Sequence, residues 1–231
     1  MQFSRIFLNR LQDQIDHHDT VVVIDVLRSF TTSAIALAQG ARAIYPVDTV
    51  SAARTLAKVM PRAVTVGAVG GGDPISGFDF GNSPAALAEA RLRGRDVILT
   101  TAAGVQGLQR FRHTRALYAA SLICAKATAD AIRDSGANAV SFVITGEWVD
   151  RDGDEDIACA DYIEALLCGE KPLRRNFSRR VRESDFGQRF AGGQNPNLPL
   201  ADLQWAVQVD KFEFAMPVHR EGNQLVIRRP K

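Results

Sequence analysis

Short apolar runs and Ala-rich runs alternate through the first two-thirds of the chain. Thr20–Asp25 and Asp96–Thr101 are apolar between their ends and rich in β-branched residues, which is typical of strands buried on both faces of a sheet. The pattern predicts strands at 20–25, 43–47, 63–66, 96–101, 116–119 and 139–144. It predicts helices over 51–60, 105–111, 122–134 and 156–167. Such alternation indicates an α/β protein with a largely parallel sheet that helices cover on both faces.

Capping residues mark two further helices. An Ala-rich helix is predicted to begin at Thr31 or Thr32 and to stop at Gly40, because glycine readily takes the backbone conformation that follows a helix. Ser83 followed by Pro84 is typical of an N-cap and a first helical position, and Gly94 is predicted to end that helix.

The sequence favours a single domain over 1–231, because 46% hydrophobic content in a chain of this length can supply one sizeable core. The composition changes after Leu173, and the segment from about 174 is predicted to be a C-terminal appendage that closes one end of the sheet. Gln224–Arg228 is predicted to be a final edge strand. Residues 21–47 resemble residues 97–120, which leaves open either two pseudo-repeated halves or the general likeness of βαβ units.

Charge and cysteine content exclude several classes of protein. The net charge of +2 gives the whole molecule no nucleic-acid signature, and no apolar run is long enough to span a membrane. Three cysteines without a CxxC pair indicate a reducing compartment, so we expect a cytoplasmic location. Five arginines between Arg174 and Arg182 leave three interpretations open, namely a polyanion-binding surface, a solvated face, or a face that attracts an anionic substrate.

Two strings place an acid near the start of a helix. These are Asp25-Val-Leu-Arg28, at the end of an apolar run, and Gly77-Phe-Asp-Phe-Gly-Asn-Ser-Pro84. Backbone N–H groups at a helix start, with an arginine, can hold an anion, but a carboxylate in such a place requires a cation as well. The two strings therefore predict a metal-assisted phosphate site.

Other residues are predicted to gather at the same place. In open α/β sheets ligands bind at the carboxyl ends of the strands, where Asp25, Thr100, Thr101 and the loop Gly67–Asp73 are predicted to lie. The acidic string 150–156 precedes a helix and is either a solvated turn or part of this site. Simpler interpretations remain: Asp25 as a helix cap, and Arg28 in a structural ion pair. Asn82 and Ser83 are equally explained as caps.

Four strings in order resemble one family. Val23-Ile-Asp-Val-Leu-Arg28 with Thr31-Thr32, Gly77–Pro84, Val97–Thr101 and Glu155–Ala160 are similar to the 2-phosphosulfolactate phosphatase (ComB) family. The resemblance implies a three-layer α/β/α fold with a largely parallel or mixed sheet, and a Mg²⁺-dependent phosphatase. The family reaction removes phosphate from 2-phospho-3-sulfolactate, a step toward coenzyme M.

The two lines of reasoning together give a candidate site. We expect Asp25, Arg28 and Asp79 to act in catalysis, and Mg²⁺ to be held by Asp25, Asp79, Glu155 and Asp156, because hard carboxylate oxygens suit this ion. The groups expected to bind the substrate are Thr31, Thr32, Asn82, Ser83, Thr100 and Thr101. The expected partner is a small organophosphate, with a homodimer as the expected assembly and neither nucleic acid nor membrane as a partner.

The chain also departs from the family pattern. Ala68-Val69 stand where the family tends to carry an acid and a base, Ala103 and Val105 stand where it tends to carry polar residues, and Cys124 replaces an asparagine. Polar groups that meet a charged substrate are each worth a few kcal/mol (about 1.5–3). The alternative is therefore a catalytically weakened or inactive relative that binds an organic anion.

Overall fold

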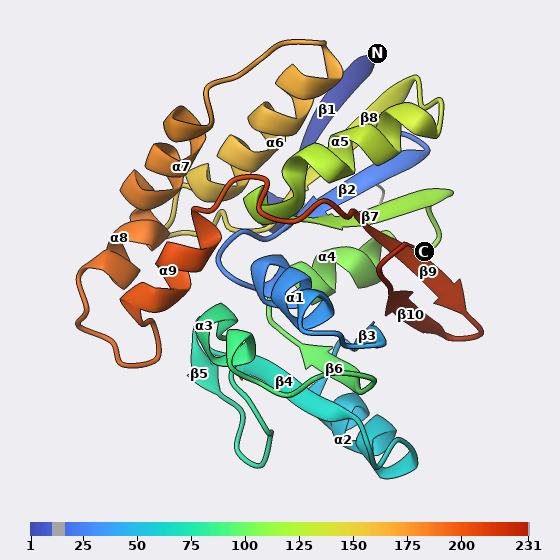
Figure 1. The fold of residues 1–231 in the computed structure, drawn as a ribbon, viewed down its shortest axis with the longest axis vertical. Coiled ribbons are helices and arrows are strands. Elements are labelled where there is room, and N and C mark those ends of the chain that lie inside the picture. Colours follow the sequence, from blue (N-terminus) through green and yellow to red (C-terminus); the bar gives the residue numbers. More distant parts are fainter. Residues whose placement is uncertain (11–16, 231) are drawn as a thin grey trace.

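In the computed structural model, which describes residues 1–10 and 17–230, the described strands form one mixed sheet (Figure 1). The strands are β1 (Gln2–Phe7), β2 (Thr20–Ile24), β3 (Ala43–Pro46), β4 (Val64–Val69), β5 (Asp73–Pro74), β6 (Asp96–Thr100), β7 (Ala116–Ala120), β8 (Ala139–Ile144), β9 (Met216–Glu221) and β10 (Gln224–Ile227). Their order in the sheet is β1-β8-β2-β7-β9-β10-β3-β6-β4-β5. The predicted α/β/α fold is confirmed.

Most of the helices form at the positions that the sequence predicts. The α-helices are α1 (Ser29–Ala38), α2 (Val50–Val59), α3 (Pro84–Ala88), α4 (Gly104–Arg110), α5 (Ala125–Asp134), α6 (Asp154–Leu167), α7 (Arg174–Glu183), α8 (Asp185–Ala191) and α9 (Leu200–Ala206). Short 3-10 helices, η1 (Leu8–Arg10) and η2 (Leu122–Cys124), follow β1 and precede α5. None of the helices that the structure describes is long and apolar enough to cross a membrane.

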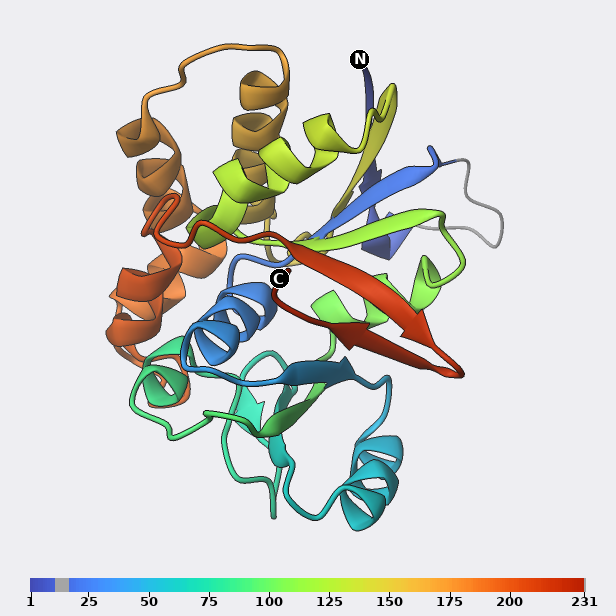
Figure 2. The same ribbon diagram turned by 45° about the vertical axis from the view of Figure 1, so that its right-hand side comes forward.

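The sheet has two groups of parallel strands. In the first, β1, β8, β2 and β7 are parallel, so that Thr20 lies between Ala116 and Val140. In the second, β3, β6 and β4 are parallel. The antiparallel hairpin β9–β10 joins them, with β9 on β7 and β10 on β3. The second view shows this hairpin between the two groups (Figure 2).

The prediction of Gln224–Arg228 as a final edge strand is therefore wrong. Strand β10 is interior because it pairs with β9 on one side and with β3 on the other, and its residues Leu225, Val226 and Ile227 are buried. The described sheet ends instead at β1 and β5. The last strands of the chain thus complete the middle of the sheet, which a reading of the sequence in order could not anticipate.

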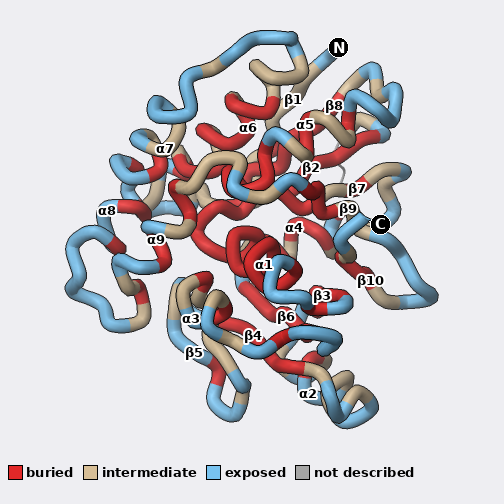
Figure 3. Tube along the Cα trace, viewed as in Figure 1, coloured by how far each residue is buried: buried red, intermediate tan, exposed pale blue. Residues whose placement is uncertain are grey.

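Alternating side chains place two cores on the two faces of the sheet. In β2, Val21 and Val23 belong to one apolar cluster, whereas Val22 and Ile24 belong to the other. The first cluster includes α1 and α4, which lie between the two strand groups (Figure 1), and α1 is buried from Ser29 to Leu37 (Figure 3). The second includes α5 and α6 together with Val181, Phe190 and Leu203 from α7, α8 and α9.

The boundaries of α1 and α3 differ from the predictions. Helix α1 begins at Ser29 rather than at Thr31 or Thr32, because Asp25 accepts the Ser29 N–H and so starts the helix earlier. Helix α3 ends at Ala88, so Gly94 does not end it. Gly94, at φ +72°, instead donates its N–H to Gly40 O at 2.8 Å in the turn before β6. The N-cap role of Ser83 is confirmed, since its hydroxyl accepts the Ala86 N–H at 3.2 Å.

Candidate active site

An open cavity of about 860 Å³ lies at the carboxyl ends of strands from both parallel groups. Asp25 follows β2, Gly70–Gly72 follow β4, Thr101 follows β6 and Thr145 follows β8, and all of them line it. Another part of the wall comes from α8 and the loop after it, through Phe186 to Leu198. This position agrees with the expectation that ligands bind at the carboxyl ends of strands.

Asp25 joins the starts of two helices at the cavity. Its Oδ1 accepts the Ser29 N–H of α1 at 2.9 Å, and its Oδ2 accepts the Gly104 N–H of α4 at 2.9 Å and the Ser29 hydroxyl at 2.6 Å. A Cβ at Gly104 would lie 2.6 Å from Asp25 Oδ2, so only glycine permits this approach. Burial raises the pKa of Asp25, although these hydrogen bonds oppose the effect.

Asp156 holds two strand ends together next to Asp25. Its Oδ1 accepts the Val26 N–H at 2.8 Å, and its Oδ2 accepts the N–H groups of Thr145 at 3.0 Å and Gly146 at 2.7 Å. The pKa of Asp156 is raised well above its ordinary value by burial, and then by the charges of Glu155 and Asp25. With its oxygens used in this way, Asp156 fixes the loops after β2 and β8.

Glu155 is the buried acid that the protein leaves without partners. Neither carboxylate oxygen has a hydrogen bond in the described structure, and the side chain is fully buried against Gly146. Burial raises the pKa of Glu155 to about 7, with the charges of Asp152 and Asp25 adding to the rise and Arg151 opposing it. A buried carboxylate without donors needs either a proton or a cation. Glu155 therefore fits a site that receives one.

Arg28 lies in the cavity wall, and a buried aspartate neutralises it. Its Nη1 donates to Asp202 Oδ2 at 2.8 Å and to Asn197 O at 2.9 Å, and its guanidinium lies 5.3 Å from the Phe190 ring centre. Asp202 also accepts the Ser83 hydroxyl at 2.6 Å, which ties Arg28 to the start of α3. Asp202 was not predicted as a site residue. Its place in the first turn of α9, after Pro199, is equally typical of an acid that only stabilises the start of a helix.

The other predicted residues fall into four places. Asn82 and Thr101 line the cavity, and the buried Oδ1 of Asn82 has no partner in the described structure. Ser83 lies behind them as cap and Asp202 donor. The remaining threonines, Thr31, Thr32 and Thr100, are buried away from the cavity wall. Asp79 is exposed outside it, where its carboxylate accepts the Thr65 N–H at 2.8 Å and so secures a loop.

Two arginines of helix α7 are neutralised by carboxylates. Arg174 Nε lies 3.0 Å from Asp210 Oδ2, and Arg180 pairs with Asp161 at 2.7 Å and with Asp154. These pairs favour a structural face over a polyanion-binding surface. The cavity instead receives Arg151 and Arg189, which the sequence reasoning missed because single arginines, one in a loop and one in a short helix, carry no pattern.

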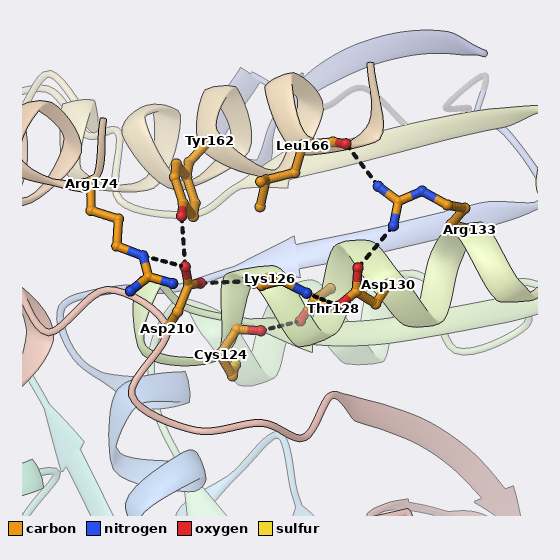
Figure 4. A network of polar contacts seen from close by, with 9 residues as sticks. All are labelled: Cys124, Lys126, Thr128, Asp130, Arg133, Tyr162, Leu166, Arg174 and Asp210. Carbon is orange, nitrogen blue, oxygen red and sulfur yellow. Dashed lines mark hydrogen bonds and ion pairs between the residues drawn. The ribbon is translucent and has the colours of Figure 1, made fainter. Parts of the chain in front are cut away.

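A second polar cluster, shown in Figure 4, lies outside the cavity wall and is centred on Asp210. Asp210 Oδ1 accepts the Lys126 N–H at 2.8 Å, and Oδ2 accepts the Tyr162 hydroxyl at 2.6 Å. Burial and this bond raise the pKa of Tyr162 to about 12. Cys124 in the same region is buried, which raises its pKa to about 11. The cluster ties α5, α6 and α7 together and leaves no reactive thiol.

Comparisons with known proteins agree on one family. The family model described as 2-phosphosulpholactate phosphatase matches residues 7–217. A protein from Carboxydothermus hydrogenoformans named "Probable 2-phosphosulfolactate phosphatase" is 33% identical over 217 residues, which cover 90% of this chain and 89% of the relative. Proteins with the same name from Bacillus subtilis (29% over 212 residues, 91% of this chain and 92% of the relative) and Synechococcus sp. (33% over 208 residues, 83% and 85%) are also similar.

Proposed function

The chain belongs to the 2-phosphosulfolactate phosphatase family, and on that premise we propose that it hydrolyses a small anionic phosphomonoester in the cavity at the carboxyl ends of β2, β4, β6 and β8. The first candidate substrate is 2-phospho-3-sulfolactate, whose hydrolysis would place the protein on a route to coenzyme M. One observation carries the proposal: Asp25 lines a cavity that Arg28, Arg151 and Arg189 also line, and the buried carboxylate of Glu155, which does not itself line the cavity, interacts electrostatically with Asp25 and Arg151.

We propose Mg²⁺ as the cofactor, held by Asp25 and Glu155. Among the described residues, no group of three or more His, Cys, Asp or Glu side chains is already arranged as a metal site. The donors nevertheless fit a hard cation, because both oxygens of the buried Glu155 lack partners and its charge and that of Asp25 disfavour each other. When bound, the ion would polarise a phosphoryl oxygen and favour ionisation of a bound water.

The protein's own residues supply position and charge around that centre. Asp25 accepts the first N–H groups of α1 and α4 and so holds the starts of both helices at the cavity. Asp156 fixes the loops that carry Asp25 and Gly146 and is a positioning residue rather than a ligand. Asn82 offers an amide that the protein leaves partly unused. Asp79 lies outside the cavity wall, so we assign it to the loop that it secures.

We propose that the chain hydrolyses 2-phospho-3-sulfolactate inefficiently or prefers another phosphorylated acid. Ala68 and Ala103 line the cavity and present methyl groups where the family tends to carry polar side chains. Val69 is 43% exposed and Val105 is buried in the core, so neither forms part of the wall. The altered surface is thus smaller than the sequence predicts, which favours phosphatase activity over its loss.

The test is phosphate release by the metal-stripped protein with and without Mg²⁺. The substrates are 2-phospho-3-sulfolactate, 2-phospholactate and 4-nitrophenyl phosphate, compared by kcat/KM. We expect Mg²⁺-dependent release, with phospholactate at least as good as phosphosulfolactate. Release without Mg²⁺ would contradict the cofactor, and no release from any of the three would favour the second candidate.

That second candidate is a relative that binds an organic anion without turning it over. It is favoured by the two methyl groups of Ala68 and Ala103 in the cavity wall. Saturable binding of sulfolactate without hydrolysis of its phosphate ester would support it. The homodimer and the cytoplasmic location stay predictions, and chromatography of the native protein tests the first.

A further inference from the structure

The three arginines of the cavity differ in how far the protein neutralises them. Arg28 donates to the buried carboxylate of Asp202, and Arg189 Nη2 lies 2.7 Å from Asp150 Oδ2. Arg151 has only Asp150 Oδ1 within 4.0 Å of its Nε. Among the described residues its guanidinium makes no hydrogen bond, although its side chain is only 17% exposed. Arg151 is therefore the cavity arginine whose N–H groups remain available to bind a ligand.

An aromatic ring holds this guanidinium in place. The Arg151 Cζ lies 4.5 Å from the centre of the Phe186 ring, and Arg189 Cζ lies 5.9 Å from the same ring. Contact with the ring face stabilises a cation and leaves the N–H groups at its edge free to donate. Burying a charge that lacks a hydrogen-bond partner is costly, so this arrangement is best explained by an anion that binds there.

The local charge also favours an anion. Two guanidinium groups, from Arg151 and Arg189, share the carboxylate of Asp150, which lies 2.7 Å from Arg189 but 4.0 Å from Arg151. Asp150 is kept ionised because Arg189 lowers its pKa. Arg151 also lies close enough to Asp25 and Glu155 for its charge to oppose the rise that burial causes in the pKa of each.

We propose that Arg151, stacked on Phe186 and flanked by Arg189, forms the oxyanion-binding subsite of the cavity. Its ligand is a tetrahedral oxyanion, either the phosphoryl or the sulfonate group of the substrate, and a planar guanidinium can donate two parallel hydrogen bonds to such a group. The inference rests on the proposed function for the identity of the substrate. Binding of the oxyanion itself requires neither turnover nor a metal.

The experiment measures binding of inorganic phosphate and of methanesulfonate to the full, metal-stripped chain by calorimetry or by nuclear magnetic resonance titration. The variants are Arg151→Ala and Arg151→Lys, with Arg115→Ala as the matched control. Arg115 is 84% exposed, does not line the cavity, and has a carboxylate no nearer than Asp19 at 3.9 Å among the described residues. Thermal unfolding of each variant checks that it folds.

We expect Arg151→Ala to weaken binding at least tenfold for phosphate, for methanesulfonate, or for both, with Lys intermediate and Arg115→Ala unchanged. Loss for phosphate alone assigns the phosphoryl group, and loss for methanesulfonate alone assigns the sulfonate. The proposal is overturned if folded Arg151→Ala binds both probes as the wild type does, or if the wild type binds neither at tens of millimolar. A protein that binds through Arg151 but hydrolyses nothing would contradict the proposed function and leave this inference standing.

Discussion

Replacing Glu155 by glutamine tests the buried acid without any assay of activity. The substitution keeps the size of the side chain and removes the ability to ionise. In the wild type, burial raises the pKa of Glu155 to about 7 from an ordinary value of 4.5. The folded protein therefore holds this proton more tightly than the unfolded chain does. The stability that this gives is complete below pH 4.5 and is lost as the pH rises to about 7.

The magnitude follows from the difference of about 2.5 pKa units, each worth about 1.4 kcal/mol. The wild type should lose about 3 kcal/mol of unfolding free energy from this group between pH 4.5 and pH 7, and Glu155→Gln should not. The new amide lacks partners as well, which costs about 1–3 kcal/mol at every pH. The test is therefore how steeply the free energy of unfolding changes with pH, rather than its value at one pH.

The assay is denaturant unfolding from pH 4 to pH 8 in the presence of a chelator, with Glu213→Gln as a control because Glu213 is exposed. Adding Mg²⁺ at pH 8 should then stabilise the wild type by about 2.7 kcal/mol at one hundred times its dissociation constant, and Glu155→Gln far less. Equal pH slopes for the wild type and Glu155→Gln would refute the reasoning about burial. Equal stabilisation by Mg²⁺ would remove Glu155 from the metal site.

Three further predictions concern the residues around this acid. Asp25→Asn should abolish Mg²⁺-dependent phosphate release and cost about 1–3 kcal/mol of stability, because the amide presents a donor to an N–H group; near-normal turnover at millimolar Mg²⁺ would leave Asp25 as a cap only. Gly104→Ala should reduce kcat at least tenfold, since its Cβ would lie 2.6 Å from Asp25 Oδ2, whereas Gly81→Ala, whose Cβ would meet nothing nearer than 3.7 Å, should not. Asp202→Asn should lower unfolding free energy by about 3–5 kcal/mol by leaving Arg28 buried without its partner, and unchanged denaturation midpoints would contradict that ion pair's role.

The layers of the fold could be predicted because the central strands, such as β2, carry consecutive apolar residues. In β2, Val21 and Val22 enter different cores, so an unbroken apolar run correctly indicates a strand with both faces covered. Strand β1 was missed because Gln2–Phe7 mixes polar and apolar residues, as an edge strand permits. The place of β10 could not be predicted, since strand order depends on pairings that join residues far apart in the chain, such as Ile227 with Ile44.

The part of the site that could be predicted consists of acids whose position along the chain already indicates a binding role. Asp25 and Glu155 could be named because each stands at a strand end or helix start, which are the places where anions and cations bind. Asp79 was placed with them because its string is distinctive, but a distinctive string also arises where a loop is held by its own hydrogen bonds. Arg151 and Asp202 were missed because their significance depends on a ring and on an arginine that the fold alone brings to them.

Residues 21–47 and 97–120, which are similar in sequence pattern, also have related positions in the topology. The unit β2–α1–β3 begins in the first parallel group and ends in the second, whereas β6–α4–β7 begins in the second and ends in the first. Each unit therefore contributes a helix to the layer between the groups, and the starts of the two helices meet at the Asp25 carboxylate. A single acid after β2 can hold both helices only because Gly104, just past the end of β6, has no side chain. The cavity thus forms where the chain crosses from each parallel group to the other. This explains why residues from both halves of the sheet line it.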